Sequence, residues 1–418
     1  MRLNRDFQKI SNRKTELDDT VTKSVQEILR NVKANGDRAV REYCEKFDGF
    51  TGSSFFVAEE EIKAAIRNVG DDYMRILQRA CRQITEYHAH QQQKSWGMDK
   101  ENGVMMGQIV RPLKRVALYV PGGTAAYPST VLMNAIPATL AGVSELFILT
   151  PVKSDGGVAD VILAAAACCG IEVIYKAGGA HGIAAAAFGT ETIAKADKIV
   201  GPGNAYVATA KRLVYGEVDI DMVAGPSEIL IIADETADPR YVAADLMSQA
   251  EHDPLASAIL VATSEKLIAE TEKEIDRQIA RLTRKDIIRS SLENYGAAIY
   301  VESLEKAFAL ANKIAPEHLE IMTENPLEML PMVRNAGSIF LGAHTPEPLG
   351  DYMSGTNHVL PTGGTARFFS PLGVHDFVKY SAYSYYPREA LAELSDDVIR
   401  FAESEGLDAH ANAVKVRF

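Results

Sequence analysis

The stretch VALYVPGG, residues 116–123, decides the fold class because it joins an apolar run to a glycine turn. Five consecutive apolar or aromatic residues bounded by a turn are typical of a strand buried inside a sheet. A segment that favours a helix, residues 130–141, follows the turn. The order of strand, turn and helix indicates a parallel sheet with helices packed on its faces.

Three further units of this kind follow. Strand-like segments occupy residues 145–150, 172–176 and 198–200, and helix-like segments follow them at 158–169, 183–188 and 205–215. Four such units in series predict one α/β domain at residues 119–227. Parallel sheets bind ligands at the carboxyl ends of their strands, where this block has glycine turns. The turns lack the GxGxxG and P-loop patterns, so they permit a nucleotide without requiring one.

A second α/β block follows, in which strands and helices alternate through residues 228–372. Residues 16–118 show mostly amphipathic helical patterns, and we expect them to join 228–372 as a discontinuous first domain. The block at 119–227 would then be an insertion that binds the nucleotide. We expect residues 1–15 to form an N-terminal arm and 373–418 a helical C-terminal tail. The predicted fold is therefore α/β, with two incomplete Rossmann-like parallel-sheet domains.

Length and composition exclude several classes of protein. A chain of 418 residues is too long for one compact core, and its 47% hydrophobic and 24% charged residues are typical of a soluble globular protein. No apolar run is long enough for a membrane span and the N-terminus lacks a signal-peptide core, so we expect a cytoplasmic protein without a membrane partner. A net charge of -12 argues against a nucleic-acid partner.

The four cysteines show no C-x-x-C spacing, which favours reduced thiols over disulfides. Aldehyde oxidation often uses a cysteine nucleophile, so Cys168 and Cys169 need consideration. They end an apolar, alanine-rich helix, where cysteine usually acts as a small buried hydrophobe. We therefore assign no catalytic role to this pair.

A helix is predicted at residues 238–253, with Asp238 as its N-cap and Asp253-Pro254 at its end. Gln249 and His252 fall on one polar face of this helix. Residues at that spacing are neighbours and can share a metal ion, although an isolated pair is more often a solvated face.

Other polar clusters could complete such a site. Glu317 and His318 are adjacent proton acceptors of different basicity, which a reaction that moves several protons requires, although a helix cap and a packed histidine explain them equally well. Asp351 lies in a glycine-rich loop, where it could also serve as a turn residue. Gln249, His252, Asp351 and His410 together would form a nitrogen and oxygen site that suits a catalytic zinc ion.

Eight motifs resemble, in order, those of the histidinol dehydrogenase family. They are YVPGG 119–123, GPGN 201–204, AGPSE 224–228, SQAEH 248–252, APEH 315–318, GDY 350–352, NHVLPT 357–362 and EGLDAH 405–410. The resemblance implies the last steps of histidine biosynthesis, in which L-histidinol is oxidised to the aldehyde and then to L-histidine, with two NAD and one water consumed. It also implies a homodimer with exchanged terminal segments, in which His410 and Glu405 reach the site of the other subunit.

The resemblance assigns roles to individual residues. The ligands of one zinc ion per subunit would be Gln249, His252, Asp351 and His410, and Glu317 and His318 would be the acid/base pair. Ser227, His318 and Glu405 would contact substrate together with those ligands, and Tyr119, His181 and Asn204 would stand at the NAD contacts. His181 departs from the family pattern, which has glutamine there, and an imidazole cannot reproduce the paired donor and acceptor of an amide.

Three rival functions use the same residues differently. A dehydrogenase of another small polyol would have little reason to keep Glu405 and His410. A zinc hydrolase could use Glu317 as its base, but it would leave the nucleotide-like block unexplained. A binding protein without activity would require an inactive metal or nucleotide site.

Overall fold

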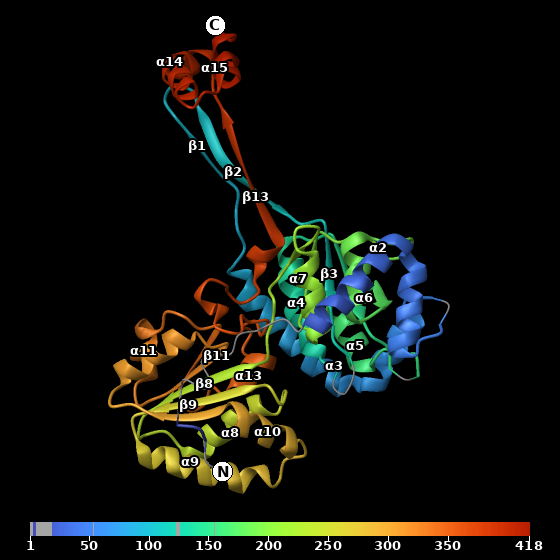
Figure 1. Cartoon of the computed structure of the whole chain (residues 1–418), viewed down its shortest axis with the longest axis vertical. Coiled ribbons are helices and arrows are strands. Elements are labelled where there is room, and N and C mark those ends of the chain that lie inside the picture. The colour runs from blue at the N-terminus through green and yellow to red at the C-terminus, as the bar shows by residue number, and fades with distance from the viewer. Residues whose placement is uncertain (1–2, 6–18, 53, 123–125, 154) are drawn as a thin grey trace.

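The computed structural model describes residues 3–5, 19–52, 54–122, 126–153 and 155–418. Two five-stranded parallel sheets form the body of the molecule. A three-stranded antiparallel sheet rises from the body as a long arm that carries the last two helices (Figure 1). The predicted α/β class with two parallel sheets is confirmed.

The first sheet has the strand order β5-β4-β3-β6-β7. Numbered along the chain, this order is 3-2-1-4-5, which is the Rossmann order without its sixth strand. The strands are β3 (Arg115–Tyr119), β4 (Glu145–Thr150), β5 (Ile174–Lys176), β6 (Lys198–Val200) and β7 (Asp219–Ile220), and the helices between them are α4 (Pro128–Ala141), α5 (Asp160–Cys168), α6 (Gly179–Phe188) and α7 (Ala205–Val214).

Two long N-terminal helices complete this first sheet rather than the second. Helix α2 (Asp19–Asp48) packs on α6 and α7, and α3 (Glu59–Ala89) packs on α4 and α5 (Figure 1). These two helices lie within residues 16–118, which were grouped with 228–372, yet their contacts are with the helices of the first sheet, and β3 also begins inside that range. The reason is that α4 and α6 are buried almost all round, so they need a further amphipathic layer outside them.

The second sheet repeats the topology of the first, with the order β10-β9-β8-β11-β12. Its strands are β8 (Glu228–Ala233), β9 (Ser257–Ala262), β10 (Gly296–Tyr300), β11 (His318–Met322) and β12 (Ser338–Leu341), and its helices are α8 (Pro239–Ala250), α9 (Glu265–Ile279), α10 (Lys285–Tyr295), α11 (Leu304–Ile314), α12 (Pro326–Met329) and α13 (Glu347–Tyr352). Of the expected arm at 1–15, only residues 3–5 are described, and Asn4 forms a parallel bridge with Ala297 of the same chain.

The two sheets present opposite strand ends to each other. In the first sheet the strand order reverses between β3 and β6, so the carboxyl ends at Tyr119 and Gly201 mark its usual ligand site. A short connection, residues 221–227, runs from the carboxyl end of β7 to the amino end of β8. His318 begins β11, which neighbours β8, so the predicted acid/base pair lies at the amino end of the second sheet.

The arm consists of β1 (Trp96–Asp99), β2 (Met105–Pro112) and β13 (Val378–Tyr385), and it carries α14 (Arg388–Ser404) and α15 (Asp408–Lys415). Strand β13 pairs with β2 over its whole length (Figure 1). The tail at 373–418 was expected to be helical, but its first part is this strand. Its composition explains the difference, because the tyrosine-rich sequence VKYSAYSY favours an extended chain.

Residues 353–377 join the two sheets. The Nδ2 atom of Asn357 donates to the carbonyl of Met133 in α4 at 2.7 Å, and Val359, Leu372 and Phe377 enter the apolar core beneath α3 and α4. This contact holds the loop after α13 against the first sheet. Across the described ranges, no helix is long and apolar enough to cross a membrane.

Candidate active site

Glu317 and His318 are fixed by the first residue of β8. The backbone N–H of Glu228 donates to Oε2 of Glu317 at 2.8 Å, and Nδ1 of His318 lies 2.9 Å from the carbonyl oxygen of Glu228. A carbonyl can only accept, so the neutral imidazole carries its proton on Nδ1 and has a free lone pair on Nε2.

Burial shifts the pKa values of this pair in opposite directions. Desolvation raises the pKa of Glu317 well above its usual value, and the negative charges of Glu228, Asp351 and Glu347 raise it further. Desolvation also lowers the pKa of His318 to about 4. Burial therefore favours the neutral form of both side chains when no cation is bound. Two buried groups with displaced pKa values are typical of a catalytic site.

Helix α13 supplies two carboxylates to the same place. Glu347 Oε1 lies 3.6 Å from Nε2 of His318, and Asp351 Oδ1 lies 3.5 Å from Nδ1 of His358. One ligand atom each from His318, Glu347 and Asp351 lie within 4.8 Å of one another, which is close enough to hold a metal ion. Burial alone would raise the pKa of Asp351, but the hydrogen bond with His358 and the nearby histidine charges hold it below its usual value.

Asp351 was expected in a loop, but it lies on α13. The same helix brings in Glu347, which sequence analysis missed. The two residues are four positions apart and therefore lie on one face of the helix. That spacing was visible in the sequence, but a helix of six residues that itself contains a proline and a glycine gives too weak a pattern to be recognised.

Helix α8 brings Gln249 to the site, and its predicted N-cap is confirmed because Asp238 accepts from the N–H of Arg240. Gln249 is fully buried, yet both polar atoms of its amide lack a hydrogen-bond partner among the described residues. His252 follows the helix end, and its charge is among the smaller contributions to the pKa shifts of His318 and Asp351. An unpartnered buried amide normally costs free energy, so this one points to a missing ligand.

Ser227 is half-buried and immediately precedes β8, where its carbonyl oxygen accepts from the N–H of Ser257 at 2.9 Å. The preceding turn is tied down as well, because the N–H of Gly225 donates to Oγ1 of Thr362 at 2.5 Å. These contacts place Ser227 at the same amino edge of the second sheet as Glu317.

Within one chain, Glu405 and His410 do not join these residues. Both lie at the end of the arm, where they line a groove between α14 and α15, far from α13 (Figure 1). Both side chains are exposed, as are Phe401 of α14 (70%) and Val416 directly after α15 (68%). Within one chain, α15 with His410 therefore lies apart from α13 and the adjacent α8, which carry Asp351 and Gln249.

Tyr119 and Asn204 lie at the point where the strand order of the first sheet reverses. The hydroxyl of Tyr119 accepts from the N–H of Gly179 at 3.1 Å, and burial raises its pKa to about 12. Asn204 caps α7, because its side chain accepts from the N–H groups of Tyr206 and Val207. Tyr119 therefore contacts the glycine turn that contains Gly179, and Asn204 joins the glycine turn at 201–204 to α7. Both turns lie at the carboxyl edge of the sheet.

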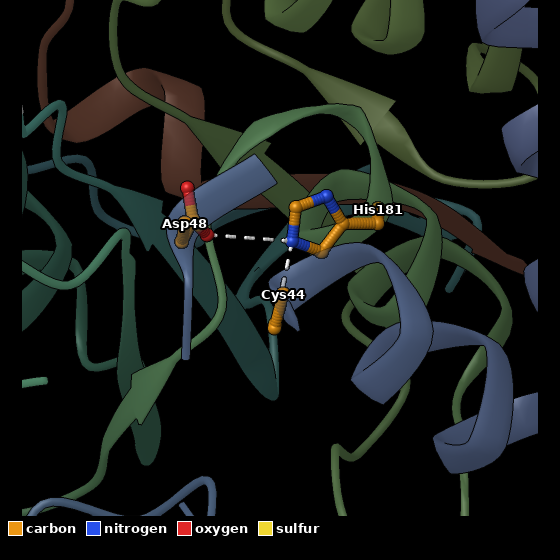
Figure 2. Close-up of side chains that lie close together, drawn as sticks. All are labelled: Cys44, Asp48 and His181. Atoms are coloured by element: carbon orange, nitrogen blue, oxygen red, sulfur yellow. Dashed lines mark hydrogen bonds and ion pairs between the residues drawn. The ribbon is translucent and has the colours of Figure 1, made fainter. Parts of the chain in front are cut away.

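His181 lies in the first turn of α6, but its ring points into the protein interior. Figure 2 shows Nε2 turned towards Cys44 and Asp48 of α2. The Nδ1 atom is buried without a hydrogen-bond partner in the described part of the chain. Burial lowers the pKa of His181 to about 4, so the ring is neutral at pH 7.

Known proteins resemble the chain along nearly its whole length. A family model described as histidinol dehydrogenase matches residues 11–418. Curated relatives named histidinol dehydrogenase include one from Lactococcus lactis, 60% identical over 413 residues that cover 98% of this chain and 96% of the relative. Another, from Clostridium acetobutylicum, is 57% identical over 412 residues and covers 99% and 96%. A crystal structure of histidinol dehydrogenase from Elizabethkingia anophelis superposes with a TM-score of 0.94 at 39% identity and covers 98% of this chain and 95% of that one.

Proposed function

The chain belongs to the histidinol dehydrogenase family and is an oxidoreductase that oxidises histidinol in histidine biosynthesis, and on this premise we propose how it works. We propose a four-electron oxidation of L-histidinol to L-histidine through a bound aldehyde, with two NAD and one zinc ion per subunit. The observation that carries the proposal is the convergence of His318, Glu347 and Asp351 on one buried place, next to helix α8, whose buried Gln249 amide lacks a hydrogen-bond partner among the described residues. We place the enzyme in the cytoplasm, where its four free thiols would stay reduced.

The donor set fits a zinc ion. Gln249 and Asp351 offer oxygen and His252 offers nitrogen, and a set without thiolate is typical of catalytic rather than structural zinc. The buried amide of Gln249 gains the partner that it otherwise lacks. Held by Gln249, His252 and Asp351, a zinc ion would supply a positive centre that attracts the nitrogen atoms of histidinol and helps to orient the substrate.

His410 of the partner subunit would complete this ligand set. The exposed apolar side chains of α14 and α15 support an exchange of tails in a homodimer, because these helices have little core of their own. Glu405 of the partner subunit would then face the substrate imidazole, and Ser227 would contact the substrate from the edge of β8. No nucleic acid or membrane partner is part of this proposal.

NAD fits the carboxyl edge of the first sheet. The reversal of strand order between β3 and β6 is the usual dinucleotide site of such sheets, and Tyr119 and Asn204 stand at the two strand ends. His181 stands at the third expected contact, where its ring is buried and Nδ1 lacks a hydrogen-bond partner among the described residues.

In the first oxidation, His318 takes the hydroxyl proton while a hydride passes from the carbinol carbon to NAD. The bond to the Glu228 carbonyl leaves Nε2 as the basic nitrogen, and the lowered pKa keeps it unprotonated at neutral pH. The products of this step are the aldehyde and NADH.

In the second oxidation, Glu317 would take a proton from water, and the resulting hydroxide would add to the aldehyde carbon to give the ionised hydrate. The ionised hydrate would lose a second hydride, which a second NAD would accept when bound, and the carboxylic acid formed would release a proton to solvent to give the carboxylate of histidine. This role needs Glu317 ionised. Asp351 and Glu347 contribute to its raised pKa, so a cation bound among them would lower that pKa.

One assay tests the proposed function. Histidinol added to the purified enzyme and NAD should produce two NADH per histidinol, read as absorbance, and a chelator should abolish the signal until zinc is restored. Asp351→Asn should lose both activity and the zinc ion of the proposed active site. A yield of one NADH per histidinol would contradict the proposed second oxidation. NADH formation that is unchanged after the chelator has removed the metal would exclude the proposed role of zinc. Oxidation of other polyols at an equal rate would favour the rival dehydrogenase.

A further inference from the structure

A second group of potential metal ligands lies outside the proposed active site. Cys44 and Asp48 come from the end of α2, and His181 comes from the start of α6 (Figure 2). The Nε2 atom of His181 lies 3.4 Å from Sγ of Cys44 and 3.8 Å from Oδ2 of Asp48. One ligand atom from each of the three residues lies within 4.8 Å of the others.

The site is deeply buried. Cys44 is fully buried and His181 is 1% exposed, while the side chain of Asp48 keeps 17% exposure. The rings of Tyr43 and Phe47 lie about the imidazole, with ring centroids 6.0 and 6.1 Å from it. A metal ion here would be shielded from water except on the side of Asp48.

The spacing of the ligand atoms matches a tetrahedral metal. With zinc bond lengths of about 2.0 to 2.3 Å, neighbouring ligand atoms of a tetrahedron lie about 3.4 to 3.6 Å apart. The two distances from Nε2, 3.4 and 3.8 Å, agree with this to within a few tenths of an ångström. A hydrogen bond explains the 3.4 Å between Nε2 of His181 and Sγ of Cys44 equally well. It gives no reason, however, for Asp48 to face the same nitrogen.

We infer that Cys44, Asp48 and His181 bind a divalent cation of the zinc type, with water as the fourth ligand. Sulfur and imidazole nitrogen select zinc or cobalt over magnesium and calcium, which prefer oxygen alone. Binding forms bonds from the metal to sulfur, nitrogen and oxygen, and it releases the thiol proton of Cys44 to solvent. The ion would link the end of α2 to the glycine turn that opens α6.

Protonation sets the pH dependence of this site. Burial, with help from the charge of Asp48, raises the pKa of Cys44 to about 12, and burial raises the pKa of Asp48 to about 6. Nearby Arg41 acts in the opposite direction on Cys44. The metal must displace the thiol proton, so its affinity should increase as the pH rises from 6 to 9.

Cobalt(II) tests the inference, because cobalt bound to a thiolate has a strong charge-transfer absorption in the near ultraviolet. The proposed catalytic ligands include no thiolate, so that band reports thiolate ligands outside the proposed active site. Metal-free full-length protein titrated with cobalt should bind two ions per subunit and develop the band. Cys44→Ser should abolish the band and bind one ion. Asp48→Asn should keep the band at saturation, with an affinity lower by about tenfold or more.

Two further variants separate this site from the remaining thiols and from the proposed active site. Cys81→Ser is the matched control, because Cys81 belongs to a different thiol group with Cys168 and Cys169, and it should keep the band. Asp351→Asn should lose the ion of the proposed active site, which gives no band, and keep the ion at Cys44, Asp48 and His181, which gives the band. The experiment therefore distinguishes failure of the proposed active site from failure of the second site. One ion per subunit with no band in the unmodified protein, or a band that survives Cys44→Ser, would overturn the inference. Circular dichroism would confirm that each variant is folded.

Discussion

Nδ1 of His318 lies 2.9 Å from the carbonyl oxygen of Glu228, and this contact sets the proton position on the imidazole. The opposite nitrogen, Nε2, faces Oε1 of Glu347 at 3.6 Å in the same buried place. The carboxylate of Glu317 is held separately by the N–H of Glu228. The backbone of Glu228 therefore orients both Glu317 and His318, the proposed acid/base pair. Each of the two side chains can act in a different step.

Replacement of Glu317 by glutamine should slow the aldehyde step far more than the alcohol step. Glutamine keeps the hydrogen bond from Glu228 but cannot take a proton from water, and general base catalysis is worth about 10²- to 10⁴-fold. Single-turnover measurements that start from added aldehyde and from histidinol would separate the two steps. His318→Gln is the matched variant and should slow the alcohol step more. Equal losses in both steps for Glu317→Gln would contradict this division of roles.

Mixed dimers test whether the tail of one subunit completes the site of the other. His410→Asn and Asp351→Asn should each abolish activity and lower zinc content. A heterodimer of the two variants contains one site with both changes and one with neither, so it should recover about half of the activity per dimer. The two homodimers, mixed without subunit exchange, are the control. No recovery in a verified heterodimer would mean that both residues act in the same chain.

The alternation of strands and helices in the sequence predicts the fold well where each element is buried on both faces. The predicted strand at Val116–Val120 and helix at Thr130–Ala141 match β3 and α4 to within a few residues. The place of α2 and α3 could not be predicted, because an amphipathic helix shows that one face is buried but not which sheet buries it. The local pattern carries no information about that partner.

The candidate site was predictable only in part for a similar reason. The resemblance to a family supplied Gln249, Asp351 and Glu317, while local patterns alone left each of them open. The inward turn of His181 could not be predicted, because it depends on Cys44 and Asp48, more than 130 positions earlier in the chain. Contacts at that separation in sequence appear only once the chain is folded.

A buried ion pair should stabilise the glycine turn at Gly201. The side chains of Lys211 and Asp221 are 3% and 1% exposed, and they form an ion pair with each other. Lys211 Nζ also donates to the Gly201 carbonyl at 2.8 Å, and Asp221 accepts from the Gly201 N–H at 2.7 Å. Lys211→Met leaves the aspartate charge buried alone, which should lower the free energy of unfolding by about 3 to 5 kcal/mol.

Urea unfolding at a fixed protein concentration would measure this change. The double variant Lys211→Met with Asp221→Asn removes the unpaired charge while the asparagine oxygen still accepts from Gly201. It should therefore recover part of the lost stability. If the double variant were as unstable as Lys211→Met alone, loss of packing rather than an uncompensated charge would be the cause.

The buried carboxyl pair of Asp245 and Glu320 should make stability fall as the pH rises. Burial raises the pKa of Asp245 to about 6 from 3.8, and the pKa of Glu320 is raised well above its usual value by burial and by the charge of Asp245. A raised carboxyl pKa means that the folded state holds a proton that the unfolded state has lost. Stability is therefore greatest below about pH 4 for this group and declines through about pH 6, by up to about 3 kcal/mol for Asp245.

Asparagine at position 245 cannot ionise, so Asp245→Asn should show a smaller decline between pH 4 and pH 8 in urea unfolding. The variant should gain stability relative to the unmodified protein at pH 8 and lose that advantage near pH 4. Asp71→Asn, at an exposed position in α3, is the matched control and should run parallel to the unmodified protein. An Asp245→Asn profile that also runs parallel would show that Asp245 stays ionised in the folded state, since only a proton held there can link its burial to pH.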